Sequence, residues 1–157
     1  MPKHGLVVRY KRKPGSGRGT AKQRERVISV ALTRWLRSEY PDVVFFIDWA
    51  SGAFLTKGQN DARLDVSCRN GWVDIFIAEP RRGYHGLFIE LKKEGVRIYL
   101  KDGKTLCSDP QIRKEADFLM RQHRKGYCAR FAVGLEKAQE LIDWYFNRER
   151  PTNLEMF

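Results

Sequence analysis

Two short apolar stretches decide the fold of this chain: residues 71–78, which read GWVDIFIA, and residues 84–92, which read YHGLFIELK. Both are rich in the β-branched and aromatic residues that favour strands, and the segment between them contains Pro and Gly. We therefore predict strands over 73–78 and 87–91, paired as a hairpin.

The other elements are predicted from hydrophobic periodicity and from residues that cap helices or form turns. Before the pair we expect a helix over 20–39 that begins with the capping-box residues Thr20 and Gln23, a buried strand over 43–47, and a short helix over 60–66 inside the polar insertion 49–70. After it we expect a hairpin over 96–107 with its turn at 101–104, a helix over 110–125 that begins at Ser108-Asp109-Pro110, a strand over 130–133, and a closing helix over 135–146 that buries Ala138, Leu141, Ile142 and Tyr145. The order helix, three strands, helix, strand, helix indicates the α/β class.

The first predicted helix has an acid within its apolar stripe. At about 100° per residue the stripe consists of Val27, Ile28, Ala31, Leu32, Trp35 and Leu36. Glu25 falls between Leu32 and Leu36 on this projection. A buried carboxylate is costly unless it is paired or bound to a metal. Glu25 is therefore either such a group or a residue of a frayed first turn that reaches solvent, and the pattern leaves both interpretations open.

The two central strands bring acids and a base together. Because side chains alternate along a strand, Glu90 and Lys92 share one face, and hairpin pairing about the middle of the loop puts Asp74 nearly opposite Glu90. Like charges that face each other destabilise a sheet, and a hard divalent cation relieves the conflict. The run ELKKE at 90–94 is by itself typical of a solvated strand end. With Asp74 opposite, it predicts a site for metal-assisted hydrolysis of a phosphodiester.

The composition indicates a folded protein with a polyanionic partner. The chain has 157 residues, 42% of them hydrophobic, and a formal net charge of +11. Its three cysteines are odd in number and lack CxxC spacing, which favours reduced thiols over a disulfide framework or a zinc cluster. No run of residues is typical of a signal peptide or of a membrane span. We therefore expect an intracellular protein that makes no use of a membrane.

Much of the positive charge is concentrated near the N-terminus. Residues 1–24 hold eight Lys or Arg and no acid. We predict a flexible basic arm over 1–19, a single folded domain over 20–147 and a tail over 148–157. The insertion 49–70 is interpreted as a segment that faces DNA. The candidate DNA-binding residues in the arm and the insertion are Lys11, Arg12, Lys13, Arg18, Lys57, Arg63 and Arg69.

The strand pair, together with Gln111 at the start of the next helix, resembles the VRR-NUC domain, a branch of the PD-(D/E)XK nucleases that is common among stand-alone bacteriophage proteins. The resemblance runs from about residue 23 to residue 146. It implies a restriction-endonuclease-like core, αβββαβα, with a central mixed sheet flanked by helices. Two departures are visible: Val73 stands where the family usually has Pro, and the segment 96–107 is longer than the usual link.

The resemblance also implies roles for individual residues. Asp74 and Glu90 would be ligands of Mg²⁺ or Mn²⁺, with the Leu91 carbonyl completing the shell. Glu25 matches the acid of the family's first helix and would complete the metal site directly or through water. Lys92 would position or activate the attacking water.

Gln111 would help to orient Lys92 or the DNA backbone. The alternative is an ordinary capping-box glutamine paired with Ser108, and one residue there can serve both purposes. The family further implies a DNA endonuclease selective for structures such as Holliday junctions or flaps. Stand-alone members resemble homodimeric junction resolvases, so we expect a homodimer in the cytoplasm of a phage-infected host. The alternatives are a non-catalytic DNA-binding module and a nuclease that acts on RNA.

Overall fold

One mixed four-stranded sheet organises the chain, in the order β1-β2-β3-β4. The computed structural model describes residues 21–48, 56–66 and 73–147, except the side chains of residues 21–25, 60 and 63–66. The elements are α1 (Ala21–Glu39), β1 (Phe45–Ile47), α2 (Lys57–Val66), β2 (Ile75–Ile77), β3 (Leu87–Lys92), α3 (Pro110–Arg124), β4 (Cys128–Val133) and α4 (Gly134–Tyr145). This order confirms the predicted α/β arrangement, including the short helix in the insertion.

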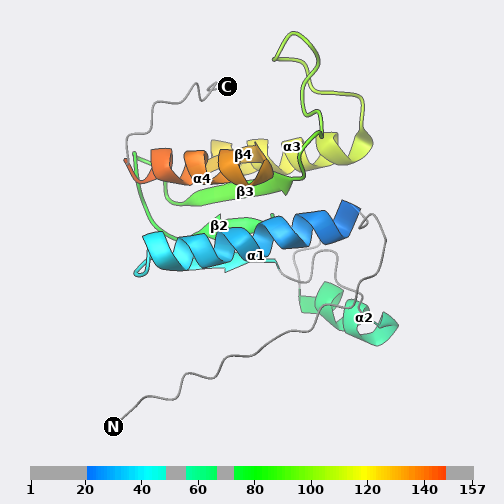
Figure 1. Cartoon of the computed structure of the whole chain (residues 1–157). Helices are drawn as coiled ribbons and strands as arrows, with labels where there is room; N and C mark the ends of the chain where they lie inside the picture. The colour runs from blue at the N-terminus through cyan, green and yellow to red at the C-terminus, as the bar shows by residue number, and fades with distance from the viewer. Residues whose placement is uncertain (1–20, 49–55, 67–72, 148–157) are drawn as a thin grey trace, which may run out of the picture.

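The sheet is covered by helices on both faces. Strands β1, β2 and β3 are antiparallel, and β4 runs parallel to β3 because α3 forms the crossover between them. Helices α1 and α4 lie on one face and α3 lies on the other (Figure 1). The mixed, helix-flanked sheet predicted for the core is thereby confirmed. No helix within the described ranges combines the length and the apolar character needed to cross a bilayer.

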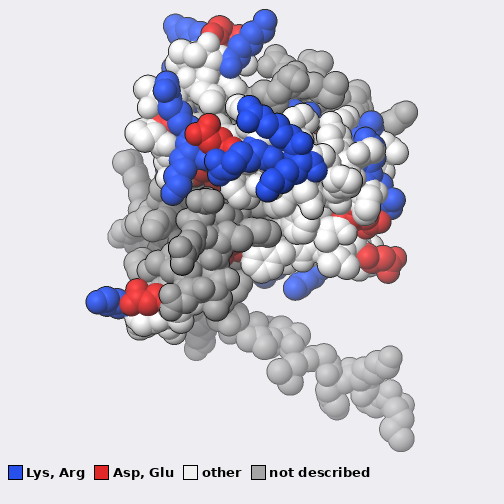
Figure 2. All heavy atoms as spheres, turned by 180° about the vertical axis from the view of Figure 1, so that it is seen from behind, with Lys and Arg blue, Asp and Glu red and all other residues white. Residues whose placement is uncertain are grey.

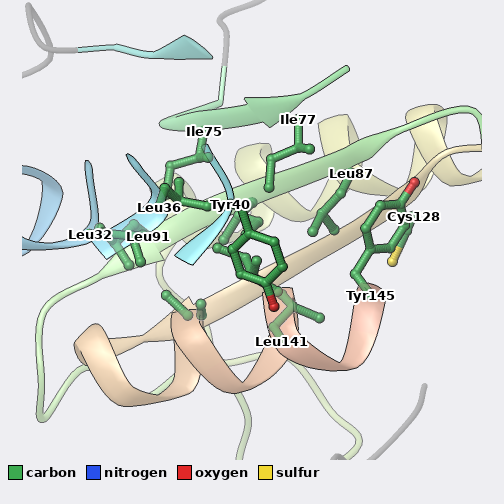
Figure 3. Close-up of a cluster of buried hydrophobic side chains, with 14 residues drawn as sticks. Leu32, Leu36, Tyr40, Ile75, Ile77, Leu87, Leu91, Cys128, Leu141 and Tyr145 are labelled. Atoms are coloured by element: carbon green, nitrogen blue, oxygen red, sulfur yellow. The ribbon is translucent and has the colours of Figure 1, made fainter. Parts of the chain in front are cut away.

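The main core lies between the sheet and the helices α1 and α4. Ile75 and Ile77 of β2 and Leu87 of β3 are fully buried and point toward Leu141 and Tyr145 of α4 (Figure 3). The predicted buried face of α4 is confirmed. Alternate residues of the same strands, such as Phe88, face α3 in a second cluster. Strand β3 therefore presents one face to each helical layer.

The apolar stripe of α1 is narrower than predicted. Leu32 and Leu36 are completely buried, but Val27 is 68% exposed, so its assignment to the core was wrong. Val27 precedes Leu32 by five residues, which places it about 140° away around the helix. A stripe centred on Leu32 and Leu36 leaves that position on the flank.

The strand predicted over 43–47 is present, but the prediction that it is buried was wrong. The strand β1 is confined to Phe45–Ile47 at the edge of the sheet, and Phe46 is 50% exposed. Phe46 is the partner of Phe76, whose side chain lies on the α3 side of the sheet. Because α3 packs over β3 and β4, it leaves the β1 end of this face open to solvent.

The link between β3 and α3 folds as the predicted hairpin. Tyr99 and Leu106 form an antiparallel bridge, and the Leu100 N–H donates to the Thr105 carbonyl at 2.7 Å. Its turn contains Gly103 at φ 68°, a conformation that favours glycine. The hairpin lies beside the sheet and leads directly into α3, which carries part of the site described next.

Candidate functional site

The acid pair lies where β2 begins and β3 ends. Asp74 immediately precedes β2, and the register Ile75↔Ile89 continues to put it opposite Glu90, as predicted. The Leu91 N–H donates to Asp74 Oδ2 at 2.8 Å, which fixes the orientation of the carboxylate. In a strand the N–H and C=O of one residue point to the same edge, so the Leu91 carbonyl also faces the Asp74 side.

Lys92 lies between two carboxylates on the α3 face of the sheet. Its Nζ is 2.9 Å from Glu90 Oε1 and 2.8 Å from Glu115 Oε2. The three side chains are 13%, 10% and 11% exposed, respectively. Because these side chains are largely removed from solvent, dissolved salt screens their ion pairs less than it screens an ion pair at the surface. The predicted common face of Glu90 and Lys92 is confirmed, and a third residue, Glu115, joins them.

The electrostatics of this corner are unbalanced in favour of negative charge. Burial, followed by the charge of Asp74, raises the pKa of Glu90 to about 9, and Lys92 only partly opposes that rise. Burial of the Lys92 ammonium would lower its pKa, but Glu90 and Glu115 outweigh that effect and raise it. Lys92 therefore stays charged, while the acid pair is a place where an added cation is favourable.

Gln111 is connected to the site through Glu115. Its side-chain Nε2 donates to Glu115 Oε1 at 2.7 Å, one turn further along α3. The helix cap is Asp109, which accepts from the backbone N–H groups of Gln111 and Ile112, so the pairing of Gln111 with Ser108 was wrong. Asp109 takes the cap because Pro110 occupies the first helical position directly after it.

Glu115 was missed by the sequence analysis. The only signal that could have found it is its position four residues after Gln111, which places both side chains on the same part of the helix. Glu115 also precedes the buried Ala116 and follows the buried Ile112. It therefore lies at the edge of the helix face that packs on the sheet.

The residues of this corner suit a hard divalent cation. Asp74 and Glu90 supply carboxylate oxygens, and the Leu91 carbonyl lies on the same edge, whereas Mg²⁺ binds through one or two carboxylates and keeps several waters. Among the described side chains, no three of His, Cys, Asp or Glu converge as a metal cluster. The fit rests on the two facing acids and on the raised pKa of Glu90, which a bound cation would reverse.

Several other predicted site residues lie outside what the structure describes. Glu25 is part of α1, seven residues before the buried Leu32, but its side chain is not described. The same holds for Arg63 in α2. Lys57 begins α2 and is exposed. The remaining predicted DNA-binding residues, and the predicted arm and tail, lie outside the described ranges: Lys11, Arg12, Lys13, Arg18 and Arg69.

A basic surface lies on the side of the molecule that α3 covers. Lys and Arg side chains gather on the face opposite to the one seen in Figure 1 (Figure 2). The α3 basic surface is defined here as the exposed cations of α3 and its C-cap: Arg113, Lys114, Arg121, Arg124 and Lys125. Because α3 also carries Glu115, this surface adjoins the candidate site.

A search of solved structures gives a match that covers most of the chain. A protein described as "VRR_NUC domain protein" superposes with a TM-score of 0.52 at 20% sequence identity, over 80% of this chain and 89% of that one. This chain has the VRR-NUC fold. The VRR-NUC fold predicted from residues 71–77 and 84–92 is thereby confirmed, while the roles of its individual side chains rest on the geometry above. No protein-family profile and no curated protein matches the sequence.

Proposed function

We propose that the chain is a metal-dependent nuclease that hydrolyses phosphodiester bonds in DNA and uses Mg²⁺ or Mn²⁺. The observation that carries the proposal is the meeting of three groups at one corner of the sheet: the facing acids Asp74 and Glu90, and the Lys92 ammonium 2.9 Å from Glu90. A purely structural ion pair has no need of a second acid that repels the first. The VRR-NUC fold supports the same conclusion.

Each residue has a distinct task in this proposal. Asp74, Glu90 and the Leu91 carbonyl would hold the metal ion. Glu25 of α1 is proposed as a further acid of this site, directly or through water. A bound Mg²⁺ or Mn²⁺ supplies a Lewis acid for the phosphate and lowers the pKa of a bound water. The Leu91 N–H keeps Asp74 in place, since it holds one carboxylate oxygen at 2.8 Å.

Lys92 contributes hydrogen-bond donors and a positive charge beside the acids. Its pKa is raised by its carboxylate neighbours, so the ammonium stays charged at neutral pH. A charged ammonium donates three hydrogen bonds, of which its two carboxylate partners take at most two. The third can hold the attacking water or a phosphate oxygen. Lys92 thereby positions the nucleophile and stabilises the negative charge that develops on the phosphate.

DNA would reach this corner across the α3 basic surface. Exposed Lys and Arg bind the phosphate backbone and release its counterions, which gives affinity without a sequence preference. The predicted basic arm and the insertion would add contacts of the same kind. We propose branched DNA, a four-way junction or a flap, as the substrate, bound by a homodimer. A twofold dimer brings two active sites to a symmetric junction that needs two cuts.

The test is cleavage of a panel of flaps, four-way junctions, duplexes and single strands, in Mg²⁺, in Mn²⁺ and in EDTA. We expect cutting of branched DNA that requires a divalent ion and is lost in Glu90→Gln and Lys92→Ala. The matched control is Glu94→Gln, because Glu94 is an exposed acid at the end of the same run.

Three outcomes would contradict the proposal. If both site variants cut as well as the wild type, the site is wrong. If the chain binds DNA but never cuts it, with affinity indifferent to divalent ions, it is a binding module. If it cuts an RNA junction in preference to a DNA junction of the same shape, the substrate is RNA.

A further inference from the structure

We propose that Glu115 is a positioning residue that holds Lys92 in the active site. The observation is the path of contacts from Gln111 Nε2 to Glu115 Oε1 at 2.7 Å, and from Glu115 Oε2 to Lys92 Nζ at 2.8 Å. The inference rests on the proposed function, because it gives Glu115 its task through the catalytic role of Lys92. It extends that function by a residue from a different element, the helix α3.

A second carboxylate is needed because Glu90 would contact both the metal ion and Lys92. As a metal ligand, Glu90 directs its negative charge to the cation and attracts the Lys92 ammonium less strongly. The cation itself repels that ammonium. An anion that does not bind the metal is required to keep the ammonium nearby. Glu115 meets this requirement because it approaches Lys92 from α3, whereas Asp74 and Glu90 belong to the sheet.

The charge balance of the corner points the same way. Asp74, Glu90 and Glu115 carry three negative charges when ionised, and Lys92 carries one positive charge. Loss of the Glu115 charge would leave the metal ion and the Lys92 ammonium with one negative charge fewer around them, and the ammonium would be held less firmly.

Glu115 is itself held rigidly enough to act in this way. The helix α3 is packed on the sheet by its buried residues Ile112, Ala116 and Leu119, which surround position 115 on the helix. The Glu115 side chain is 11% exposed, and Gln111 donates to its other oxygen. Gln111 therefore acts on Lys92 through Glu115, which gives a physical form to the predicted orienting role of that glutamine.

The first experiment measures cleavage by three variants under saturating Mg²⁺. Glu115→Gln keeps the shape and loses the charge, and we expect kcat to fall about 10- to 100-fold with little change in KM for DNA, as misplacement of a catalytic group does. Glu115→Asp keeps the charge and is expected to restore part of the loss. The matched control Asp117→Asn, an exposed acid on the same helix, should cleave as the wild type does.

A double-mutant cycle distinguishes positioning from a separate contribution. If Glu115 acts through Lys92, Glu115→Gln changes the residual cleavage of Lys92→Ala by less than about twofold, because the two losses are not additive. A full additional loss in that background would overturn the inference. The inference would also be overturned if Glu115→Gln kept the wild-type kcat while the single variant Lys92→Ala was inactive. The proposed function would then stand while this inference fails.

A second measurement needs neither metal nor cleavage. The ammonium of Lys92, labelled with nitrogen-15, is expected to give a slowly exchanging NMR signal in the metal-free wild type, because the side chains of Glu90 and Glu115 both contact it. The signal should broaden or disappear in Glu115→Gln and persist in Asp117→Asn. An unchanged signal in Glu115→Gln would overturn the inference. If Lys92→Ala still cuts DNA, the proposed function fails, and this measurement still tests the contact itself.

Discussion

Replacing Glu90 by Gln is expected to stabilise the metal-free protein while it abolishes cleavage. The Glu90 carboxylate is buried beside Asp74 and Glu115, and burial, followed by the charge of Asp74, raises its pKa from 4.5 to about 9. Gln has nearly the same shape, carries no charge and keeps an oxygen that accepts from Lys92. The substitution therefore removes an electrostatic cost that the wild type bears for the sake of its function.

The size of the effect follows from proton linkage. Between pH 4.5 and about 9, the folded protein keeps a proton on Glu90 that the unfolded chain has released, so stability falls as the pH rises. At pH 7 the ordinary pKa is exceeded by about 2.5 units, which at about 1.36 kcal/mol per unit gives an upper limit of about 3 kcal/mol. We expect Glu90→Gln to gain about 1 to 3 kcal/mol at pH 7 and little at pH 5.

The assay is urea unfolding in EDTA at several values between pH 5 and pH 8, followed by circular dichroism. The control is Glu136→Gln, because Glu136 is an exposed acid of α4, and its stability should stay within about 0.5 kcal/mol of the wild type at every pH. A Glu90→Gln protein that is less stable than the wild type at pH 7, or whose gain in stability does not grow with pH, would show that the wild-type Glu90 side chain carries no such electrostatic cost.

Three further predictions concern the fold and the DNA-binding surface. Tyr40→Phe removes the buried hydrogen bond from the Tyr40 hydroxyl to Asp143 Oδ1 and should lower the free energy of unfolding by about 1 to 3 kcal/mol in urea titrations. Gly86→Ala places a Cβ 2.8 Å from a backbone oxygen of β2 and should lower the free energy of unfolding by about 1 to 3 kcal/mol. At Gly58 an added Cβ meets nothing within 4 Å, so Gly58→Ala should stabilise α2 by up to about 1 kcal/mol. Equal effects at both glycines would contradict the close packing at Gly86. Arg121→Ala should weaken binding to all DNA sequences alike and reduce the slope of log K against log salt by about 1, and an unchanged slope would exclude a phosphate contact there.

The facing acids could be predicted because local geometry leaves little freedom. Side chains alternate along a strand, and a short connection between two strands permits few registers. These two constraints were enough to place Asp74 opposite Glu90, and Glu90 on the same face as Lys92. The helix cap at Asp109 and the crossover helix α3 follow from similarly local signals. The fold and the arrangement of Asp74, Glu90 and Lys92 are thus encoded in short segments.

The errors and omissions share one physical cause. The exposure of Val27 and Phe46 depends on which helix covers which part of the sheet, and no local pattern specifies that. The contact of Glu115 with Lys92 joins residues 23 positions apart through the packing of α3 on β3. A glutamate in an amphipathic helix is most often solvated, so only the assembled structure distinguishes this one from its neighbours.

The proposed function depends on the binding of a divalent cation by Asp74 and Glu90 together. The most direct measurement is an anomalous difference map from a crystal soaked in Mn²⁺. We expect one peak between these two carboxylates, at about 2.0 to 2.3 Å from an oxygen of each. A map without a peak there, in crystals where both side chains are accessible, would contradict this binding. So would an ion bound elsewhere while Glu90 stays paired with Lys92.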